Sequence, residues 1–213
     1  MSEKYTDIIM KDKVYPIVRC KDAKRTIEIS NALIEGGIRI LEINVETPEI
    51  YEAIKEVSNY ATVCAGGIIT MTQADYAFKS GAKLFSSPIF QMSLVKISKN
   101  LGIPFIAGTT TASEAYAAWK TRVPLIKIFP AAAMGGVEYL ENILRQMPFL
   151  SLMPTGSIKL SDTIGYLKAG ASAVGVGRDF YQGLTPNEIT TKTKEILTEV
   201  KDFTLWNKKQ TLQ

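Results

Sequence analysis

The sequence predicts an α/β fold, a single (β/α)8 TIM barrel with an extra helix at its N-terminus. Short apolar runs of strand length recur eight times along the 213 residues, and helix-like stretches lie between them. Successive runs start roughly 21–26 residues apart, which matches the repeat of a compact barrel. An open doubly wound sheet shares the alternation of strands and helices and is the alternative. Eight evenly spaced units without a long interruption favour the closed barrel.

The apolar runs set the predicted strands. Residues 1–13 are predicted to form the N-terminal helix, with Glu3–Asp12 as its body, and residues 203–213 to form a loosely held tail. The whole chain, 1–213, is predicted to be one domain because no linker or low-complexity segment interrupts it. The eight predicted strands are residues 14–18, 38–43, 61–65, 82–86, 103–107, 124–129, 150–154 and 172–176.

Helices are predicted between the strands. Several of them end at a glycine that leads straight into the next strand, as in the stretches 35–38 and 80–82. Glycine tolerates the left-handed conformation that commonly ends a helix. The clearest predicted helices are residues 22–35, 48–59, 72–80, 113–120 and 137–146.

Composition argues against several classes of protein. Hydrophobic residues make up 46% and charged residues 22%, values that are typical of a soluble globular protein. The net charge of +4 and the scattered lysines are not those of a nucleic-acid-binding protein. No apolar run approaches the ~18 residues that suggest a membrane span, and the first residues lack a signal-peptide core. Because Cys20 and Cys64 also lack CxxC spacing, we expect no disulfide framework and a cytoplasmic location.

The chain contains no histidine. A Ser-His-Asp triad and a histidine-ligated zinc site are therefore excluded. Acid–base chemistry must use carboxylates, lysine, tyrosine, cysteine or water.

A lysine interrupts the apolar run at 124–129. Lys127 lies in its middle, with Leu125 and Phe129 on the same side of the predicted strand. One interpretation is a lysine whose ammonium group reaches out to the rim of the barrel. The other is a desolvated amine with a depressed pKa, used as a nucleophile toward a carbonyl group.

Two more charged residues belong to predicted strands. Glu42 interrupts the second strand amid apolar residues, and it forms either a structural ion pair with Lys127 or part of a functional site. Arg19 directly follows the first strand, where a rim charge is the ordinary interpretation. Because reactive groups of such barrels gather at the C-terminal ends of strands, we expect the three to converge there.

The last two strands end in small residues. The stretches MPTGSI at 153–158 and VGVGR at 174–178 each lead toward a helix. Backbone N–H groups and helix N-termini at these places often hold phosphate, although each stretch alone is also an ordinary tight turn. Together they predict a phosphate site.

These stretches resemble the class I aldolases that cleave 2-keto-3-deoxy-6-phosphogluconate (KDPG) and 4-hydroxy-2-oxoglutarate (KHG). The resemblance runs from Val14 to about Lys201 and is carried by GGIRILEINVET, SSP at 86–88, IKIFPA at 126–131, MPTGSI and VGVGR. It implies no metal and no cofactor, a small 2-keto acid as substrate and a homotrimeric assembly. The site residues that it implies are Lys127 as the Schiff-base lysine, Glu42 as the proton shuttle, Pro88 and Thr155 at the substrate, and Gly156, Ser157, Gly177 and Arg178 around the phosphate.

The chain departs from the family pattern at four of these places. Glu46 stands where relatives have threonine or arginine, and Gly67 replaces a threonine that helps to hold the pyruvate carboxylate. Ser157 replaces the second glycine of the phosphate loop, and Arg178 stands where relatives often have serine. We therefore expect Arg19 to orient the pyruvate carboxylate, since its fork can grip a carboxylate bidentately.

The resulting prediction is an aldolase that releases pyruvate, with glyceraldehyde 3-phosphate as the second product. A galactonate-type aldolase of the same family is one alternative. A non-catalytic phosphosugar-binding barrel is another, suggested by Glu46 and Gly67 but disfavoured because Lys127 and Glu42 are both present. Metal-dependent aldolases are disfavoured by the missing histidine ligands.

Overall fold

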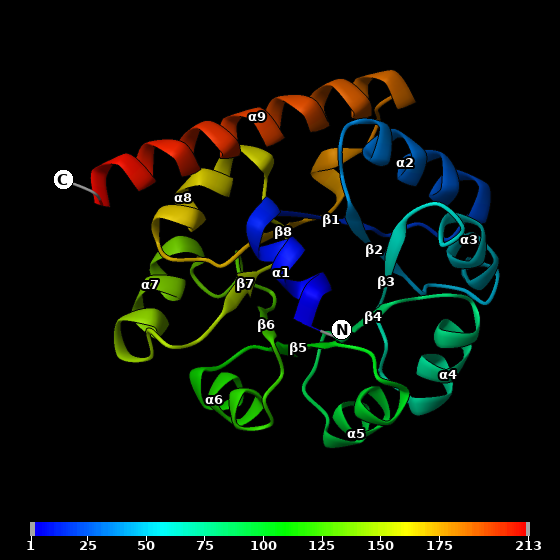
Figure 1. The fold of residues 1–213 in the computed structure, drawn as a ribbon, viewed down its shortest axis with the longest axis horizontal. Helices are drawn as coiled ribbons and strands as arrows, with labels where there is room; N and C mark the ends of the chain where they lie inside the picture. Colours follow the sequence, from blue (N-terminus) through cyan, green and yellow to red (C-terminus); the bar gives the residue numbers. More distant parts are fainter. Residues whose placement is uncertain (1–2, 212–213) are drawn as a thin grey trace.

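Eight parallel strands form a barrel, in the order β7-β6-β5-β4-β3-β2-β1-β8. The structure is a computed structural model that describes the backbone of residues 3–211 and the side chains of residues 5–207. An isolated bridge between Thr155 and Gly175 brings the β7 and β8 edges together, so that the sheet nearly closes. The predicted barrel with its N-terminal helix is confirmed, and Figure 1 looks along it. The strands are β1 (Val14–Val18), β2 (Ile40–Asn44), β3 (Thr62–Gly66), β4 (Leu84–Ser86), β5 (Phe105–Thr109), β6 (Leu125–Ile128), β7 (Leu152–Pro154) and β8 (Val174–Val176).

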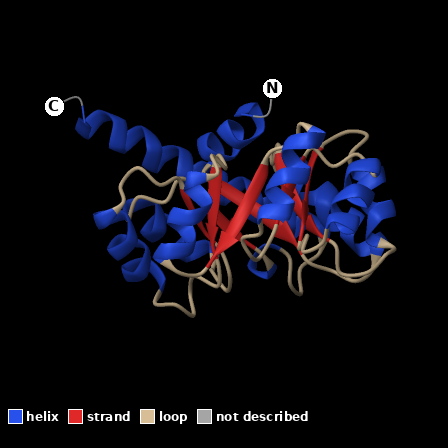
Figure 2. Ribbon diagram, turned by 90° about the horizontal axis from the view of Figure 1, so that it is seen from below, coloured by secondary structure: helices blue, strands red, loops and turns tan. Residues whose placement is uncertain are grey.

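Helices surround the strands, as Figures 1 and 2 show. Their buried faces pack on the outside of the sheet in one continuous apolar cluster. The α-helices are α1 (Glu3–Asp12), α2 (Ala23–Glu35), α3 (Ile50–Val57), α4 (Met71–Lys79), α5 (Met92–Leu101), α6 (Ala112–Lys120), α7 (Gly136–Gln146), α8 (Thr163–Lys168) and α9 (Pro186–Thr211), and the 3-10 helices are η1 (Leu160–Asp162) and η2 (Arg178–Phe180).

Several strands begin two residues later than predicted. Ile38 and Ala82 opened predicted strands, yet both precede the first paired residue of β2 and β4. Each follows a glycine with positive φ, Gly37 at 109° and Gly81 at 96°, and still belongs to the turn. Both side chains are nevertheless buried. The apolar character of a residue thus indicates that its side chain is buried, but the geometry of the turn decides at which residue strand pairing begins.

The helix α1 closes the barrel at the N-terminal ends of the strands, an end that we call the floor (Figure 1). Ile9 is 1% exposed and belongs to the cluster of side chains that fills the barrel interior. The opposite end, where the strands have their C-termini, we call the mouth. Polar residues that point into the barrel from the upper part of the strands therefore face the mouth.

The C-terminal region differs from the sequence prediction. Residues 203–211, expected as part of a loosely held tail, continue α9 as a helix. No glycine or proline interrupts the helix over these residues, and Phe203 still packs against the core. Leu205 and Trp206 are exposed, and residues 212–213 lie outside the described part of the chain. Among the described helices, none has the length and apolarity that a membrane crossing requires.

Candidate active site

Lys127 and Glu42 meet inside the barrel. Their strands, β6 and β2, are four apart in the sheet of eight and therefore lie on opposite sides of the interior. The Lys127 Nζ atom lies 2.9 Å from Glu42 Oε1 and 2.9 Å from Oε2. Lys127 is 4% exposed and Glu42 1%. The lysine does not extend to the rim, and a buried carboxylate in direct contact offers an acceptor for its proton.

A glycine on β3 makes room for this ion pair. A Cβ atom on Gly66 would lie 2.3 Å from Glu42 Oε1 and 2.1 Å from Asn44 Oδ1. Either distance is far inside van der Waals contact, so a larger residue would displace both side chains. On the other side of the barrel, Gly108 pairs with Lys127 in the sheet. A Cβ there would lie 2.3 Å from the Pro88 carbonyl carbon, which places Pro88 against β5, the strand next to that of Lys127.

Polar groups without partners surround the pair. Asn44 Oδ1 and Ser86 Oγ are buried and make no hydrogen bond to another described residue. Buried polar atoms are nearly always paired, so such atoms beside a charged pair are candidates for holding a substrate. The sequence prediction missed both residues. Period-2 alternation could have found Asn44, because it points to the same face of β2 as Glu42.

Two further titratable groups lie beneath Glu42, toward the floor. Tyr15 on β1 and Cys64 on β3 are both fully buried in the barrel interior. Burial raises the pKa of Tyr15 well above 10.0, and the neighbouring Cys64 and Glu42 raise it further. Burial also raises the pKa of the Cys64 thiol, with the Glu42 charge as a second cause. Both groups are therefore protonated at neutral pH. The sequence prediction missed them because tyrosine and cysteine fit an apolar strand.

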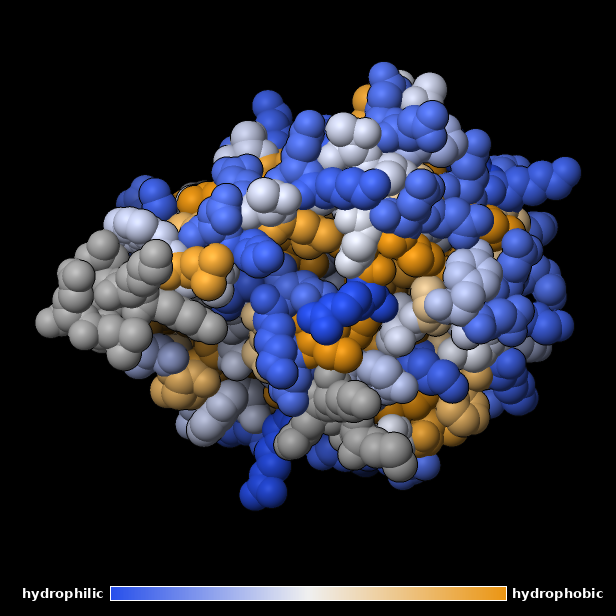
Figure 3. Space-filling model, turned by 45° about the horizontal axis from the view of Figure 1, so that its top comes forward, coloured by the Kyte–Doolittle hydropathy of each residue, from blue (hydrophilic) through white to orange (hydrophobic). Residues whose placement is uncertain are grey.

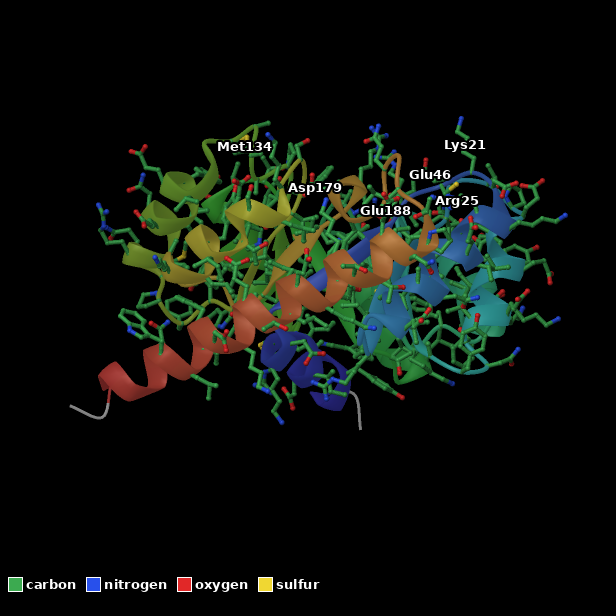
Figure 4. The ribbon with its side chains drawn as sticks, turned by 90° about the horizontal axis from the view of Figure 1, so that it is seen from above. Lys21, Arg25, Glu46, Met134, Asp179 and Glu188 are labelled. Atoms are coloured by element: carbon green, nitrogen blue, oxygen red, sulfur yellow. The ribbon has the colours of Figure 1, made fainter. Side chains whose placement is uncertain are left out.

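The structure places Arg19 at the mouth and pairs it with Glu46. Arg19 Nε lies 2.8 Å from Glu46 Oε1, and the two side chains are 53% and 22% exposed. Glu46 lies on the side of the molecule opposite α1, together with Lys21 and Arg25 (Figure 4). The backbone N–H of Arg19 donates to the Tyr181 hydroxyl, and this hydrogen bond holds the backbone of Arg19 in place. Arg19 and Glu46 therefore form an ion pair, which the sequence did not predict.

The predicted phosphate residues lie at the ends of β7 and β8. Thr155 is buried and forms the bridge to Gly175, so it joins the two strand ends. Gly156 has a φ of 106° and Ser157 a φ of 54°, and both are therefore in the left-handed region that favours glycine. A glycine at position 157 would adopt this conformation without strain, whereas Ser157 does so at a cost.

The second predicted loop lies after β8. Gly177 comes directly before η2, and Arg178 is exposed at its start. The bridge between Thr155 and Gly175 brings this loop beside the first one. The two loops therefore lie side by side at the mouth, and phosphate binding by them stays a prediction.

Comparison with known protein families matches residues 6–194 to the family described as "Aldolase: KDPG and KHG aldolase". The chain belongs to this family. This aldolase is 30% identical to the 2-dehydro-3-deoxy-phosphogluconate aldolase of Treponema pallidum over 158 residues, 73% of this chain and 75% of that protein. It is accordingly an enzyme, and its reaction class is that of a lyase.

Solved structures agree with the family. The crystal structure of the 2-keto-3-deoxy-6-phospho-gluconate aldolase from Zymomonas mobilis ATCC 29191 superposes with a TM-score of 0.81 at 26% identity, over 89% of this aldolase and 95% of that chain. The KDPG aldolase from Legionella pneumophila, solved with pyruvate captured at low pH as a covalent carbinolamine intermediate, gives a TM-score of 0.80 at 26% identity, over 88% of this aldolase and 96% of that chain.

The described residues of this aldolase contain no group of three or more histidine, cysteine or acidic side chains that could hold a metal ion. The charged residues brought together in its interior are Lys127 and Glu42.

Proposed function

We propose that this aldolase is a class I enzyme that cleaves a 2-keto-3-deoxy-6-phospho sugar acid, or 4-hydroxy-2-oxoglutarate, to pyruvate and an aldehyde through a Schiff base on Lys127. The observation that carries the proposal is the buried contact between Lys127 Nζ and both oxygens of Glu42 at 2.9 Å. A nucleophilic amine needs a neighbour that accepts its proton, and Glu42 is that neighbour. The covalent pyruvate adduct of the Legionella pneumophila relative supports the same chemistry.

The reaction begins with attack of Lys127 on the C2 ketone. Water leaves as the iminium forms, and the cationic nitrogen accepts the electron pair of the C3–C4 bond as that bond breaks. Glu42, directly or through a water molecule, takes the proton of the C4 hydroxyl group, which becomes the aldehyde. It then returns a proton to C3 of the enamine, and hydrolysis releases pyruvate.

The remaining site residues are proposed to bind the two ends of the substrate. Pro88 and Thr155 line the reacting carbons, and Arg19 faces the carboxylate at the mouth. Gly156, Ser157, Gly177 and Arg178 are proposed to hold the phosphate, in agreement with their place on one edge of the mouth. Pyruvate as the keto acid, a homotrimer and a cytoplasmic location stay predictions from the sequence. Light scattering of the purified protein tests the trimer.

Trapping with pyruvate and borohydride tests the proposal without any assumption about the aldehyde. Intact mass followed by peptide mapping should find one carboxyethyl group on Lys127. Lys127→Arg keeps the charge but should abolish trapping and turnover, because a guanidinium with a pKa above ~12 is no amine nucleophile. Labelling of Lys83 instead, or no labelling of the folded wild-type protein, would contradict the assignment.

Glu42→Gln separates the nucleophile from the proton shuttle. It should still fold and should lower turnover by roughly 100-fold or more, the usual scale for loss of a positioned acid–base group. Near-normal turnover would mean that another group carries the protons.

A further inference from the structure

The Tyr15 hydroxyl is a buried polar group that the proposed reaction does not yet use. Tyr15 is 0% exposed, and its hydroxyl lies near enough to Glu42 and Cys64 to interact with both, yet it does not have the geometry of a full hydrogen bond to any described residue. A buried hydroxyl without a full hydrogen bond destabilises the folded protein. Phenylalanine would fill the same volume without that cost. A tyrosine at this place therefore calls for an explanation outside the resting structure.

The register of the barrel places the hydroxyl beneath Glu42. Ile17 of β1 pairs with Glu42 of β2, and Tyr15 lies two residues earlier on the same inward face. Two residues of strand span about 7 Å, which is close to the length of a tyrosine side chain. The ring therefore starts one layer below Glu42, and its hydroxyl approaches Glu42 and Cys64, the two groups that act on its pKa.

Formation of a Schiff base changes the number of donors that Glu42 can use. In the resting structure both carboxylate oxygens contact Lys127 Nζ. A lysine ammonium group carries three N–H bonds, whereas a protonated Schiff-base nitrogen carries one, since two hydrogens depart with the ketone oxygen as water. At most one carboxylate oxygen can then keep its donor from Lys127. The other oxygen loses its donor from Lys127 and needs a new one, because a buried charge without a partner is costly.

We propose that the Tyr15 hydroxyl is the donor that Glu42 takes up when Lys127 becomes a Schiff base, which makes Tyr15 a positioning residue for the proton transfers. The hydroxyl stays protonated because burial and its neighbours raise the pKa of Tyr15, so it can donate throughout the working range. The inference rests on the proposed Schiff-base chemistry. It adds a residue that lies on the floor side of Glu42.

The surroundings leave Glu42 as the charged partner of this hydroxyl. Cys64 on β3 is a weak hydrogen-bonding group, and its pKa is raised by burial. Lys127 on β6 is already paired with Glu42. On α1, Tyr5 packs against the same interior cluster. The hydrophobic side chains that fill this part of the barrel are Ile9, Ile40, Leu84, Ile106, Leu125, Met153 and Ala173. Thr6 of α1 is also buried.

Exchange of the pyruvate methyl protons with D2O, followed by proton NMR, tests the proposal without an aldehyde. The exchange requires the Schiff base and then an ionised Glu42 to remove a C3 proton. The saturated rate reports the covalent state, and the rate divided by KM reports the free enzyme. Both are measured against pH for the wild type, for Tyr15→Phe and for Tyr166→Phe, a control that removes the hydroxyl of a buried tyrosine in the outer core.

We expect Tyr15→Phe to shift the acid limb of the saturated rate to higher pH by about one unit, the scale of one hydrogen bond to a charged group. Without the Tyr15 hydroxyl, the ionised Glu42 carboxylate is less stable in the covalent state, whereas the free enzyme is unaffected. The limb of the rate divided by KM should stay in place, and thermal unfolding should occur at the same or a higher temperature, since the hydroxyl is unpaired in the free enzyme. Tyr166→Phe should move neither limb.

Three results would overturn the proposal: neither limb moves, both limbs move equally, or Tyr15→Phe unfolds at a clearly lower temperature. Borohydride trapping, run beside the exchange, distinguishes this failure from a failure of the proposed function. If wild type and Tyr15→Phe both trap pyruvate on Lys127 but the limbs coincide, only the role of Tyr15 is wrong. If the wild type traps nothing, the Schiff-base chemistry itself is wrong and the Tyr15 inference falls with it.

Discussion

Gly66 shows how a residue without a side chain takes part in the site. The Glu42 carboxylate occupies the volume that a Cβ at position 66 would need. The φ of Gly66 is not in the left-handed region, so its backbone suits any residue. Its requirement for glycine comes from the close approach of Glu42 and Asn44 alone.

Gly66→Ala should therefore lower turnover by roughly 100-fold, the scale reported for a misplacement of about 1 Å in a catalytic group. It should also cost about 1–3 kcal/mol of unfolding free energy through overpacking. Steady-state kinetics and urea unfolding measure the two effects. Gly165→Ala is the matched control, since the added Cβ would meet only Val137 at an ordinary 3.6 Å. Equal behaviour of the two variants would contradict the steric argument.

The ion pair between Arg19 and Glu46 bears on substrate binding. Arg19 is more than half exposed, and exposed pairs contribute only about 0–1 kcal/mol. An incoming carboxylate can therefore displace Glu46 at little cost. Glu46 therefore competes with the substrate carboxylate for Arg19.

Glu46→Gln should thus lower KM for pyruvate in the exchange assay by a few-fold, because Arg19 loses a competing carboxylate. Arg19→Lys should raise KM, since an ammonium group cannot form the bidentate contact. Arg178→Ser should leave the KM for pyruvate unchanged and impair only a phosphorylated substrate. An unchanged KM in both Glu46→Gln and Arg19→Lys would remove Arg19 from the carboxylate site.

The N-terminus of α6 is stabilised by side-chain hydrogen bonds to its backbone. Thr111 accepts from the N–H of Glu114, and Glu114 accepts from the N–H groups of Thr110 and Thr111, at 2.8 Å each. This is a capping box, and α4 has the same arrangement with Thr70 and Gln73. The backbone N–H of Thr111, and then that of Thr110, lowers the pKa of Glu114 below 4.5.

Because folding lowers the pKa of Glu114, the stabilisation that its carboxylate provides is fully present above the pKa of the unfolded chain, near 4.5. This stabilisation is lost as the pH falls through the lower pKa of the folded protein. Glu114→Gln, which imitates α4, should be less stable than the wild type at neutral pH by on the order of 0.5 kcal/mol, since the charge is exposed and screened. The difference should vanish well below pH 4.5. Thr111→Ala should cost about 1 kcal/mol at both pH values. Urea unfolding measures all three proteins, and a Glu114→Gln difference that persists in acid would contradict the electrostatic account.

The whole molecule contains two apolar cores separated by the sheet. One lies between the strands and the surrounding helices, and the smaller one fills the barrel and is covered at the floor by α1. On the face drawn in Figure 3, hydrophilic side chains predominate and hydrophobic ones appear in small areas. Ile9 of α1 belongs to the smaller core, so the helix contributes to that core as well as covering it.

Ile9→Ala should cost about 2–5 kcal/mol of unfolding free energy, because it opens a cavity at the base of the barrel core. Leu205→Ala removes a similar side chain that is 50% exposed on α9, and it should change stability by no more than about 0.5 kcal/mol. Thermal and urea unfolding compare the two. If Ile9→Ala is as mild as Leu205→Ala, then α1 does not complete the interior core.

Much of this protein could be predicted from its sequence because the relevant signals are local. Apolar runs at even spacing predicted the barrel, and the charged residues inside two of those runs indicated Lys127 and Glu42 as candidates. A charged residue inside an apolar strand is conspicuous in one dimension, so both candidate catalytic residues were found. Helix termination was less predictable: residues 203–211 contain no stop signal, and they extend α9.

Only the tertiary structure decided which residues meet. Lys127 and Glu42 are 85 residues apart, and their contact depends on barrel closure, which sets β6 opposite β2. The pairing of Arg19 with Glu46 and the place of Tyr15 beneath Glu42 likewise depend on the strand register. Tyrosine is common in apolar strands. The sequence therefore does not tell whether the hydroxyl of such a tyrosine lies near a charged side chain or among apolar ones. That distinction arises from the distance between strands, which only the closed barrel determines.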